Sequence, residues 1–123
     1  MNLGQMITAF EEADSSLLVR IDAPVLLCPG RFASYRGDYG SLALECKSEF
    51  DALPTVSEMV ISLRACVNKT FTGYKGGSFT MREETKIWIA NYSESSHHRV
   101  VAVRVGPVYV RVVSKFVGES WCD

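Results

Sequence analysis

Apolar residues recur at three- and four-residue spacings in two stretches, and each stretch predicts a helix with one apolar face. The first helix follows Asn2 and continues to about Ala13, with Gln5 placed to complete a capping box. The second follows the T-x-x-E capping box at 55–58 and ends near Asn68. We expect both helices to bury their apolar faces against a sheet.

Short runs of aliphatic and aromatic residues between turn residues predict strands at 17–21, 41–46, 78–81, 86–92, 99–105 and 108–115. Residues 24–40, rich in Pro, Gly, Tyr and Arg, separate the first two runs, and within them the cationic and aromatic stretch 31–39 is either a surface loop with some packed rings or a binding segment. Together these elements predict one α+β domain over residues 1–123. Two helices would pack on one face of a mostly antiparallel sheet of five to six strands.

Gly106-Pro107 alone separates the last two runs, which predicts a type II′ hairpin with the valines at 105 and 108 opposite each other. In that register valines form one face and belong to the core. Arg104, Tyr109 and Arg111 share the other face. Two guanidinium groups around an aromatic ring suit a phosphate-bearing ligand. The alternative is a solvated face whose arginines pair with glutamates.

Length and composition favour a small soluble domain and give no sign of a membrane or long nucleic-acid binding protein. The 123 residues, 47% hydrophobic and 22% charged, suit a single folded domain. Lys and Arg number 13 and Asp and Glu 14, so the net charge gives no general attraction to long nucleic acid. These totals do not exclude a local basic site for a small anion. Four widely separated cysteines and no secretory signal favour a reduced cytosol. No apolar run approaches the roughly 18 residues of a membrane span, so we expect a soluble protein.

A glycine-rich turn at 73–77 precedes runs that carry aromatic rings. Glycines allow the backbone to approach a ligand closely, and Lys75 offers a positive charge. Phe79, Trp88 and Tyr92 offer flat faces for a planar group. These parts predict a nucleotide-binding site, whereas an ordinary turn followed by core aromatics is the alternative. Lys75 lacks the following helix and hydroxyl residue of a Walker phosphate loop, which excludes that motif.

Catalysis would require a nucleophile with its base, paired carboxylates or a metal cluster, and the sequence offers no convincing set. His97 and His98 are adjacent in a Ser-rich stretch and are expected to be solvated loop residues. Glu83 and Glu84 are expected in a turn, where they favour solubility or cap the next strand. We therefore expect a binding protein without catalytic residues, metal or cofactor.

Three motifs follow one another in an order that resembles a family of small phage proteins. They are S-Y-R-G-x-Y-x-x-L-A-L-E at 34–45, T-F-T-G-Y-K-G-G-x-F-T-M at 70–81 and W-I-A-N-Y at 88–92. The layout, which covers most of the chain, is similar to the Thoeris anti-defence protein one family, phage sponges that capture bacterial immune signals. The resemblance implies a homo-oligomer built on dimers, with a hexamer as one form, in the host cytosol. It would bind cyclic ADP-ribose isomers without cleaving them, and in some members cyclic trinucleotides at a second site.

The resemblance also implies residue roles by motif position: Phe79 stacks on adenine, Asn91 reads its edge, Arg104 and Arg111 bind phosphate, and Arg31 and Arg36 belong to the second site. Tyr109 and Lys75 join the first site from the strand and turn patterns. The two hairpin arginines and the ring-bearing segment upstream are expected to converge in one pocket for an anion and a purine, within a chain or across a subunit contact. Open sheet edges are expected to support oligomers. Direct docking on a host protein through a strand edge and the aromatic loop is the alternative function.

Overall fold

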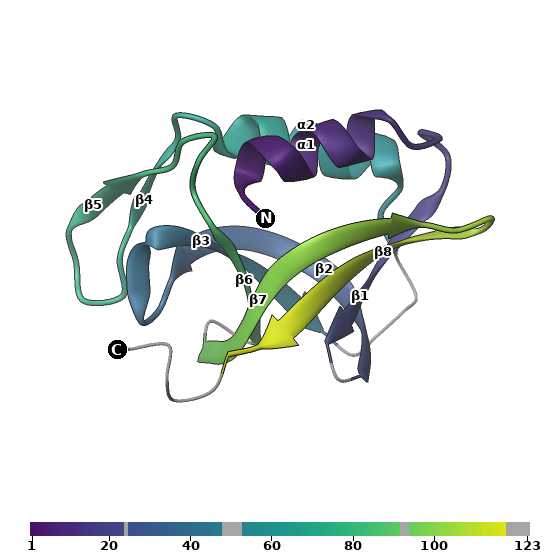
Figure 1. Ribbon diagram of the computed structural model, residues 1–123. Helices are drawn as coiled ribbons and strands as arrows, with labels where there is room; N and C mark the ends of the chain where they lie inside the picture. The colour runs from purple at the N-terminus through teal and green to yellow at the C-terminus, as the bar shows by residue number, and fades with distance from the viewer. Residues whose placement is uncertain (24, 48–52, 92–93, 118–123) are drawn as a thin grey trace.

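The computed structural model describes residues 1–23, 25–47, 53–91 and 94–117, which form two helices, a six-stranded barrel and a small two-stranded sheet (Figure 1). The elements are α1 (Leu3–Glu11), β1 (Leu18–Ala23), β2 (Val25–Tyr35), β3 (Asp38–Lys47), α2 (Val56–Cys66), β4 (Thr70–Thr72), β5 (Ser78–Thr80), β6 (Ile87–Asn91), β7 (Glu94–Val105) and β8 (Tyr109–Phe116). The barrel order is β1-β2-β3-β6-β7-β8, and β4 pairs with β5. The predicted α+β fold, with two helices and a mostly antiparallel sheet, is confirmed.

Both helices begin at the predicted capping boxes. The Gln5 amide donates to Asn2 Oδ1 at 2.8 Å, and the Asn2 amide donates back to Gln5 Oε1 at 2.9 Å. Thr55 and Glu58 make the same reciprocal pair at the start of α2. Asn68 follows α2 with a φ of 63°, a left-handed conformation that asparagine tolerates and that ends a helix. Neither described helix is long and apolar enough to cross a lipid bilayer.

The main core lies between the helices and the inner face of the barrel, and Figure 1 shows α1 and α2 side by side across this face. Each helix contributes one buried face, as its apolar spacing predicts. The largest fully buried side chains of this core are Phe10, Leu3, Met6, Ile21, Leu42, Leu44, Leu63, Met81, Ile87, Ile89 and Val19.

Two parallel pairings close the barrel, β1 with β8 and β3 with β6, and the other four pairings are antiparallel. The prediction of open edges is therefore wrong for this sheet. Parallel strands require a long connection, so local sequence patterns do not show which strands become neighbours. Among the described residues, the main sheet offers no free edge for docking on a host protein or on another copy.

The stretch 31–39 is not a surface loop, because β2 and β3 pair as an antiparallel hairpin that turns at Gly37, where φ is 118°. Pro29 and Gly30 interrupt the pattern of β2 at an irregularity in its pairing with β3. A Cβ atom on Gly30 would lie 2.9 Å from the carbonyl oxygen of Glu45, so the close approach of the two strands requires glycine. A Pro-Gly pair usually indicates a loop, but Pro29-Gly30 marks a bulge within a strand.

Val105 of β7 pairs with Val110 of β8, not with Val108 as predicted, so the loop of the β7–β8 hairpin is two residues longer than expected. Its turn spans 106–109 and is closed by a 2.9 Å hydrogen bond from the Gly106 amide to the carbonyl oxygen of residue 109. Pro107 takes the first central position, which suits its fixed φ, and Gly106 lacks the positive φ of a type II′ turn. A shift of two keeps every side chain on its predicted face. Val105 is nevertheless 58% exposed, so the valine face joins the core only beyond the tip.

Candidate functional site

Three arginines from neighbouring strands lie in a row on the outer face of the barrel. Arg104 of β7 is directly opposite Arg111 of β8, and Arg111 is in register with Arg20 of β1. They face outward because the residues that alternate with them belong to the main core: Val19, Ile21, Val103, Val110 and Val112. Since neighbouring strands lie about 4.8 Å apart, the row spans about 10 Å. We call Arg20, Arg104 and Arg111 the arginine row.

One carboxylate and one aromatic ring accompany the arginine row. Arg111 Nη1 lies 3.1 Å from Asp22 Oδ2, and the Arg20 guanidinium lies 4.4 Å from the centre of the Tyr109 ring. Arg104 is exposed, and it forms no ion pair with any described residue. Among the described residues, one carboxylate, that of Asp22, accompanies the three guanidinium groups, and it pairs with Arg111. Like charges directly across a strand pair repel each other. A phosphate group held between these forks would offset that repulsion.

The sequence predicted that Arg104, Tyr109 and Arg111 share one face of the hairpin, but it did not predict that Arg20 and Asp22 lie beside them. Apolar positions 19 and 21 alternate with Arg20, so its place on the polar face was readable from the sequence. The parallel pairing of β1 with β8 was not readable, because 91 residues of sequence separate the members of each Cα pair of the two strands. The contact of Asp22 with Arg111 follows from that pairing alone.

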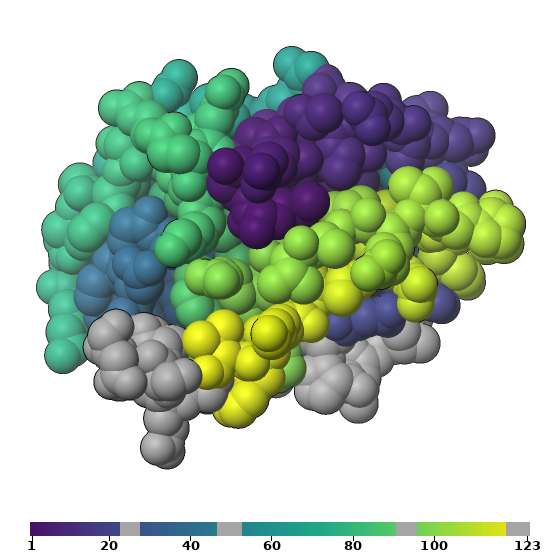
Figure 2. Space-filling model, in the orientation of Figure 1, coloured from purple at the N-terminus to yellow at the C-terminus, as the bar shows by residue number. Residues whose placement is uncertain are grey.

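Phe79 and Lys75 lie on a different part of the molecule from the arginine row. The β4–β5 hairpin stands at the opposite side from the free end of the β7–β8 hairpin in Figure 1, and Figure 2 shows the body of the molecule between them. Phe79 packs against the main core, and its ring is tilted against Tyr39 with 5.6 Å between ring centres. The prediction that these residues and the hairpin arginines form one pocket is therefore wrong within a single chain.

Glycines shape the β4–β5 turn around Phe79. The Gly76 amide donates to the Gly73 carbonyl oxygen at 2.9 Å, and the Gly73 amide donates to the Gly77 carbonyl oxygen at 3.0 Å. Gly76, with φ of 90°, completes a three-residue hairpin loop. A Cβ atom on Gly73 would lie 2.8 Å from the Phe79 ring. The glycines predicted to approach a ligand thus approach Phe79, and they cover part of the ring predicted to stack on adenine.

The two arginines of the predicted second site make separate contacts. Arg31 Nε lies 2.7 Å from Glu45 Oε1, whereas the Arg36 guanidinium lies 3.8 Å from the centre of the Tyr74 ring. Arg31 lies within β2, whereas Arg36 lies in the turn that follows it, so the two side chains start from different parts of the hairpin. Arg36 instead neighbours the β4–β5 turn, which also carries Lys75. We call Arg36, Tyr74 and Lys75 the turn cluster.

Trp88 is a buried residue, 4% exposed, rather than an exposed stacking platform. Its ring stacks on Tyr35 with 4.8 Å between ring centres and 9° between planes. Ala43 and Ala90 complete this second, small core on the outer face of the sheet. The predicted faces of β6 are correct, because Trp88 and Ala90 lie opposite the side that faces the main core. The predicted exposure of Trp88 is wrong.

Asn91 is the last residue of β6, and its backbone pairs with Cys46 of β3 and Glu94 of β7. Its side chain and the whole of Tyr92 lie outside the described part of the chain. The role of Asn91 in reading the edge of a purine therefore stays a prediction.

His97 and His98 lie in β7, not in the predicted solvated loop. His97 has a φ of 59°, and its amide donates to the Tyr35 hydroxyl at 3.1 Å. The half-buried His98 ring has Nδ1 3.4 Å from Ser114 Oγ and its centre 5.4 Å from that of the Phe116 ring. Burial first, and then the neighbouring His97, lower the pKa of His98 below its usual value.

We expect His98 to make folding less favourable as the pH falls below about 6.5, the usual pKa of an unfolded histidine. Above that pH the residue is neutral in both states and contributes nothing. Below it, the unfolded chain takes up the proton first, so the free energy of unfolding decreases until the folded state is also protonated. Urea denaturation at about pH 7.5 and 5.5 should show a smaller loss for His98→Gln than for the natural chain. Equal losses would contradict the assignment.

Three described cysteines, Cys28, Cys46 and Cys66, are buried, as their predicted role as small core residues requires. Burial raises the pKa of Cys46 and of Cys66 to about 11, so both thiols stay protonated near neutral pH and are poor nucleophiles. Cys122 lies outside the described residues. Within the described ranges, no three His, Cys, Asp or Glu side chains are grouped so as to hold a metal ion.

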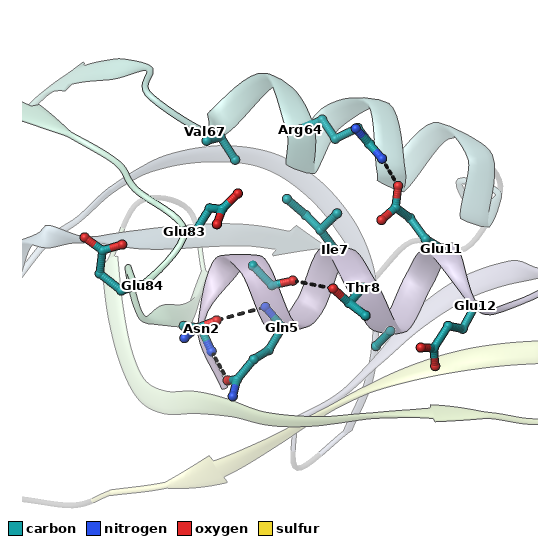
Figure 3. A pocket seen from close by; sticks show the side chains of 12 residues that line it. Asn2, Gln5, Ile7, Thr8, Glu11, Glu12, Arg64, Val67, Glu83 and Glu84 are labelled. Atoms are coloured by element: carbon teal, nitrogen blue, oxygen red, sulfur yellow. Dashed lines mark hydrogen bonds and ion pairs between the residues drawn. The ribbon is translucent and has the colours of Figure 1, made fainter.

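A groove of about 880 Å³ lies on the helix side of the molecule. Figure 3 shows Glu83 and Glu84 at one end, the Glu11–Arg64 ion pair at the other, and Ile7 and Thr8 between them. Four carboxylates and one guanidinium line the groove, so it repels phosphate. None of the predicted ligand-binding residues lines it. We call this cavity the helix groove.

The arginine row is thus the described surface whose chemistry best suits an anion, and it lies apart from the helix groove. A scan against protein-family models finds no matching family, and searches of curated proteins and of solved structures find no similar protein.

Proposed function

We propose that this chain is a binding protein that captures a phosphate-bearing nucleotide at the arginine row and sequesters it without cleaving it. The observation that supports this most directly is the alignment of Arg20, Arg104 and Arg111 across three strands, where Asp22 is the one carboxylate paired with them among the described residues. Guanidinium groups bind phosphate oxygens through two parallel hydrogen bonds and keep their charge at every physiological pH. A row of about 10 Å has room for more than one phosphate group.

The nucleotide we propose is a cyclic immune signal, such as a cyclic ADP-ribose isomer, with cyclic oligonucleotides as a further class. Tyr109 supplies an aromatic ring beside the phosphate-binding groups, and Arg20 already covers one of its faces at 4.4 Å. The cyclic character of the ligand comes from the family resemblance of the motifs at 34–45, 70–81 and 88–92. In this role a phage protein in the bacterial cytosol removes the signal from the host defence effector without catalysis.

Changing both Arg104 and Arg111 to alanine should weaken binding of cyclic ADP-ribose by about 100-fold or more. Each hydrogen bond to a charged group contributes roughly 1.5–3 kcal/mol, and about 1.4 kcal/mol corresponds to tenfold in affinity. Isothermal titration calorimetry with cyclic ADP-ribose, and with inorganic pyrophosphate as a phosphate-only probe, measures the loss. The double variant Arg64→Ala/Arg82→Ala removes the same net charge away from the arginine row and should bind like the natural chain.

Two results would overturn the proposed function. Undiminished uptake by Arg104→Ala/Arg111→Ala would mean that the hairpin face is ordinary solvated surface. Recovery of a cleaved product after incubation and heat denaturation would mean that the protein is an enzyme. If pyrophosphate binds the arginine row and cyclic ADP-ribose does not, the site holds phosphate but the proposed ligand is wrong.

A further inference from the structure

Two exposed surfaces of the chain have no part in the proposed nucleotide site. One is the helix groove between α1, the end of α2 and the residues that follow β5, and the other is the turn cluster at the free end of the β4–β5 hairpin. Each combines apolar and charged groups. The charges have opposite signs on the two surfaces.

The helix groove has an apolar floor and an acidic rim. Ile7 and Val67 are half-buried within it. Glu11 is already paired with Arg64, whereas Glu12, Glu83 and Glu84 are exposed and form no ion pair with any described residue. A partner that fits this groove must therefore supply an apolar group of moderate size with positive charges beside it.

The turn cluster has those properties. Tyr74 is 62% exposed, a large exposed fraction for an aromatic ring, and the Arg36 guanidinium covers one face of it at 3.8 Å. Lys75 is the next residue and is exposed. The hydrogen bonds between Gly73, Gly76 and Gly77 hold the turn in one conformation, so little conformational entropy is lost when it docks.

We propose that the turn cluster of one copy of this chain docks in the helix groove of a second copy. The Tyr74 ring would lie on the apolar floor, and Lys75 and Arg36 would face the carboxylates of the rim. The turn cannot reach its own groove, because the free end of the β4–β5 hairpin points away from the helices (Figure 1). Charge complementarity between these two surfaces, which no other described segment covers, therefore selects a second copy as the occupant.

Each copy has one turn cluster and one helix groove, so the contact joins two different surfaces. Such contacts close into a ring or a reciprocal pair when the geometry allows, and otherwise continue as a chain of subunits. The association does not involve the arginine row. It therefore holds or fails independently of the proposed nucleotide binding.

Sedimentation velocity of the full chain without nucleotide tests this contact. At about 0.1 M salt we expect an assembly larger than one chain that grows with protein concentration, and at about 1 M salt a weaker one, because the Debye length falls from about 10 to about 3 Å. Tyr74→Ala should weaken association about tenfold or more, whereas Tyr74→Phe keeps the ring and should associate like the natural chain. Arg104→Ala/Arg111→Ala should also associate like the natural chain.

Charge reversal identifies the two surfaces. Lys75→Glu alone, and Glu83→Lys/Glu84→Lys alone, should each weaken association about tenfold, and combining them should restore it to within about threefold of the natural chain. Far-UV circular dichroism checks that each variant is folded. A one-chain mass at every concentration up to about 1 mM would overturn the proposal. So would association that Tyr74→Ala leaves unchanged, or a combined variant that fails to recover.

Discussion

Replacing Phe10 by alanine should lower the free energy of unfolding by about 3–5 kcal/mol. Phe10 is 0% exposed on the apolar face of α1, in the core that joins both helices to the barrel. Alanine would lose the apolar contacts and leave a cavity that the surrounding strands only partly fill. Because domains of this size are stable by roughly 5–15 kcal/mol, such a variant would be close to unfolding. Urea denaturation followed by circular dichroism measures the difference.

Thr8→Ala on the same helix is the matched control. Thr8 is exposed, and its hydroxyl donates to the Gly4 carbonyl oxygen at 3.1 Å, so its loss should change stability by no more than about 0.5 kcal/mol. Equal effects of the two substitutions would mean that α1 is not packed on the barrel.

The helices were predictable from the sequence because their signals are local. Apolar spacing selects the buried face, and the capping boxes at Asn2 and Thr55 define where each helix begins. Asn68 similarly marks the end of α2 through a backbone conformation that few other residues adopt. Each signal lies within a few residues of the feature it predicts.

The barrel was harder to predict, because the information that closes it lies between distant residues. Alternation placed Val110 and Val112 inward, yet nothing near them shows that β1 will run parallel to β8. In β2, the sequence of Pro29 and Gly30 is typical of a loop, and only the structure shows that they lie at a bulge beside Glu45. The hairpin register differs from the prediction by two residues for a local reason, because Pro107 fits the first central turn position better than the second.

In the candidate site, too, local patterns predicted some residues and missed those that depend on distant pairing. Strand alternation was enough to place Arg104, Tyr109 and Arg111 on one outward face. It was not enough to add Arg20 or Asp22, which reach that face only through the parallel pairing with β1. The roles of aromatic residues were the hardest to predict, because a ring in a strand has the same local sequence pattern whether it binds a ligand or fills a core.

Trp88 is the clearest such case, and Trp88→Ala should cost about 3–5 kcal/mol of stability. The indole fills the small core on the outer face, where its stacking on Tyr35 should add about 0.5–1.5 kcal/mol beyond the buried area. A double-mutant cycle of Trp88→Ala and Tyr35→Ala, read by urea denaturation, should show coupling of that size. Strictly additive effects would mean that the two rings do not stabilise each other.

Trp88→Phe separates a packing role from the ligand-binding role that the sequence suggested. Phenylalanine keeps a ring against Tyr35, so the variant should lose less stability than Trp88→Ala and should bind cyclic ADP-ribose like the natural chain. A stable Trp88→Phe protein that no longer binds the nucleotide would place the indole in the site. Because Trp88 is 4% exposed, a ligand could reach its ring only by displacing Tyr35 or its neighbours, and such a rearrangement would break the stack that the cycle measures.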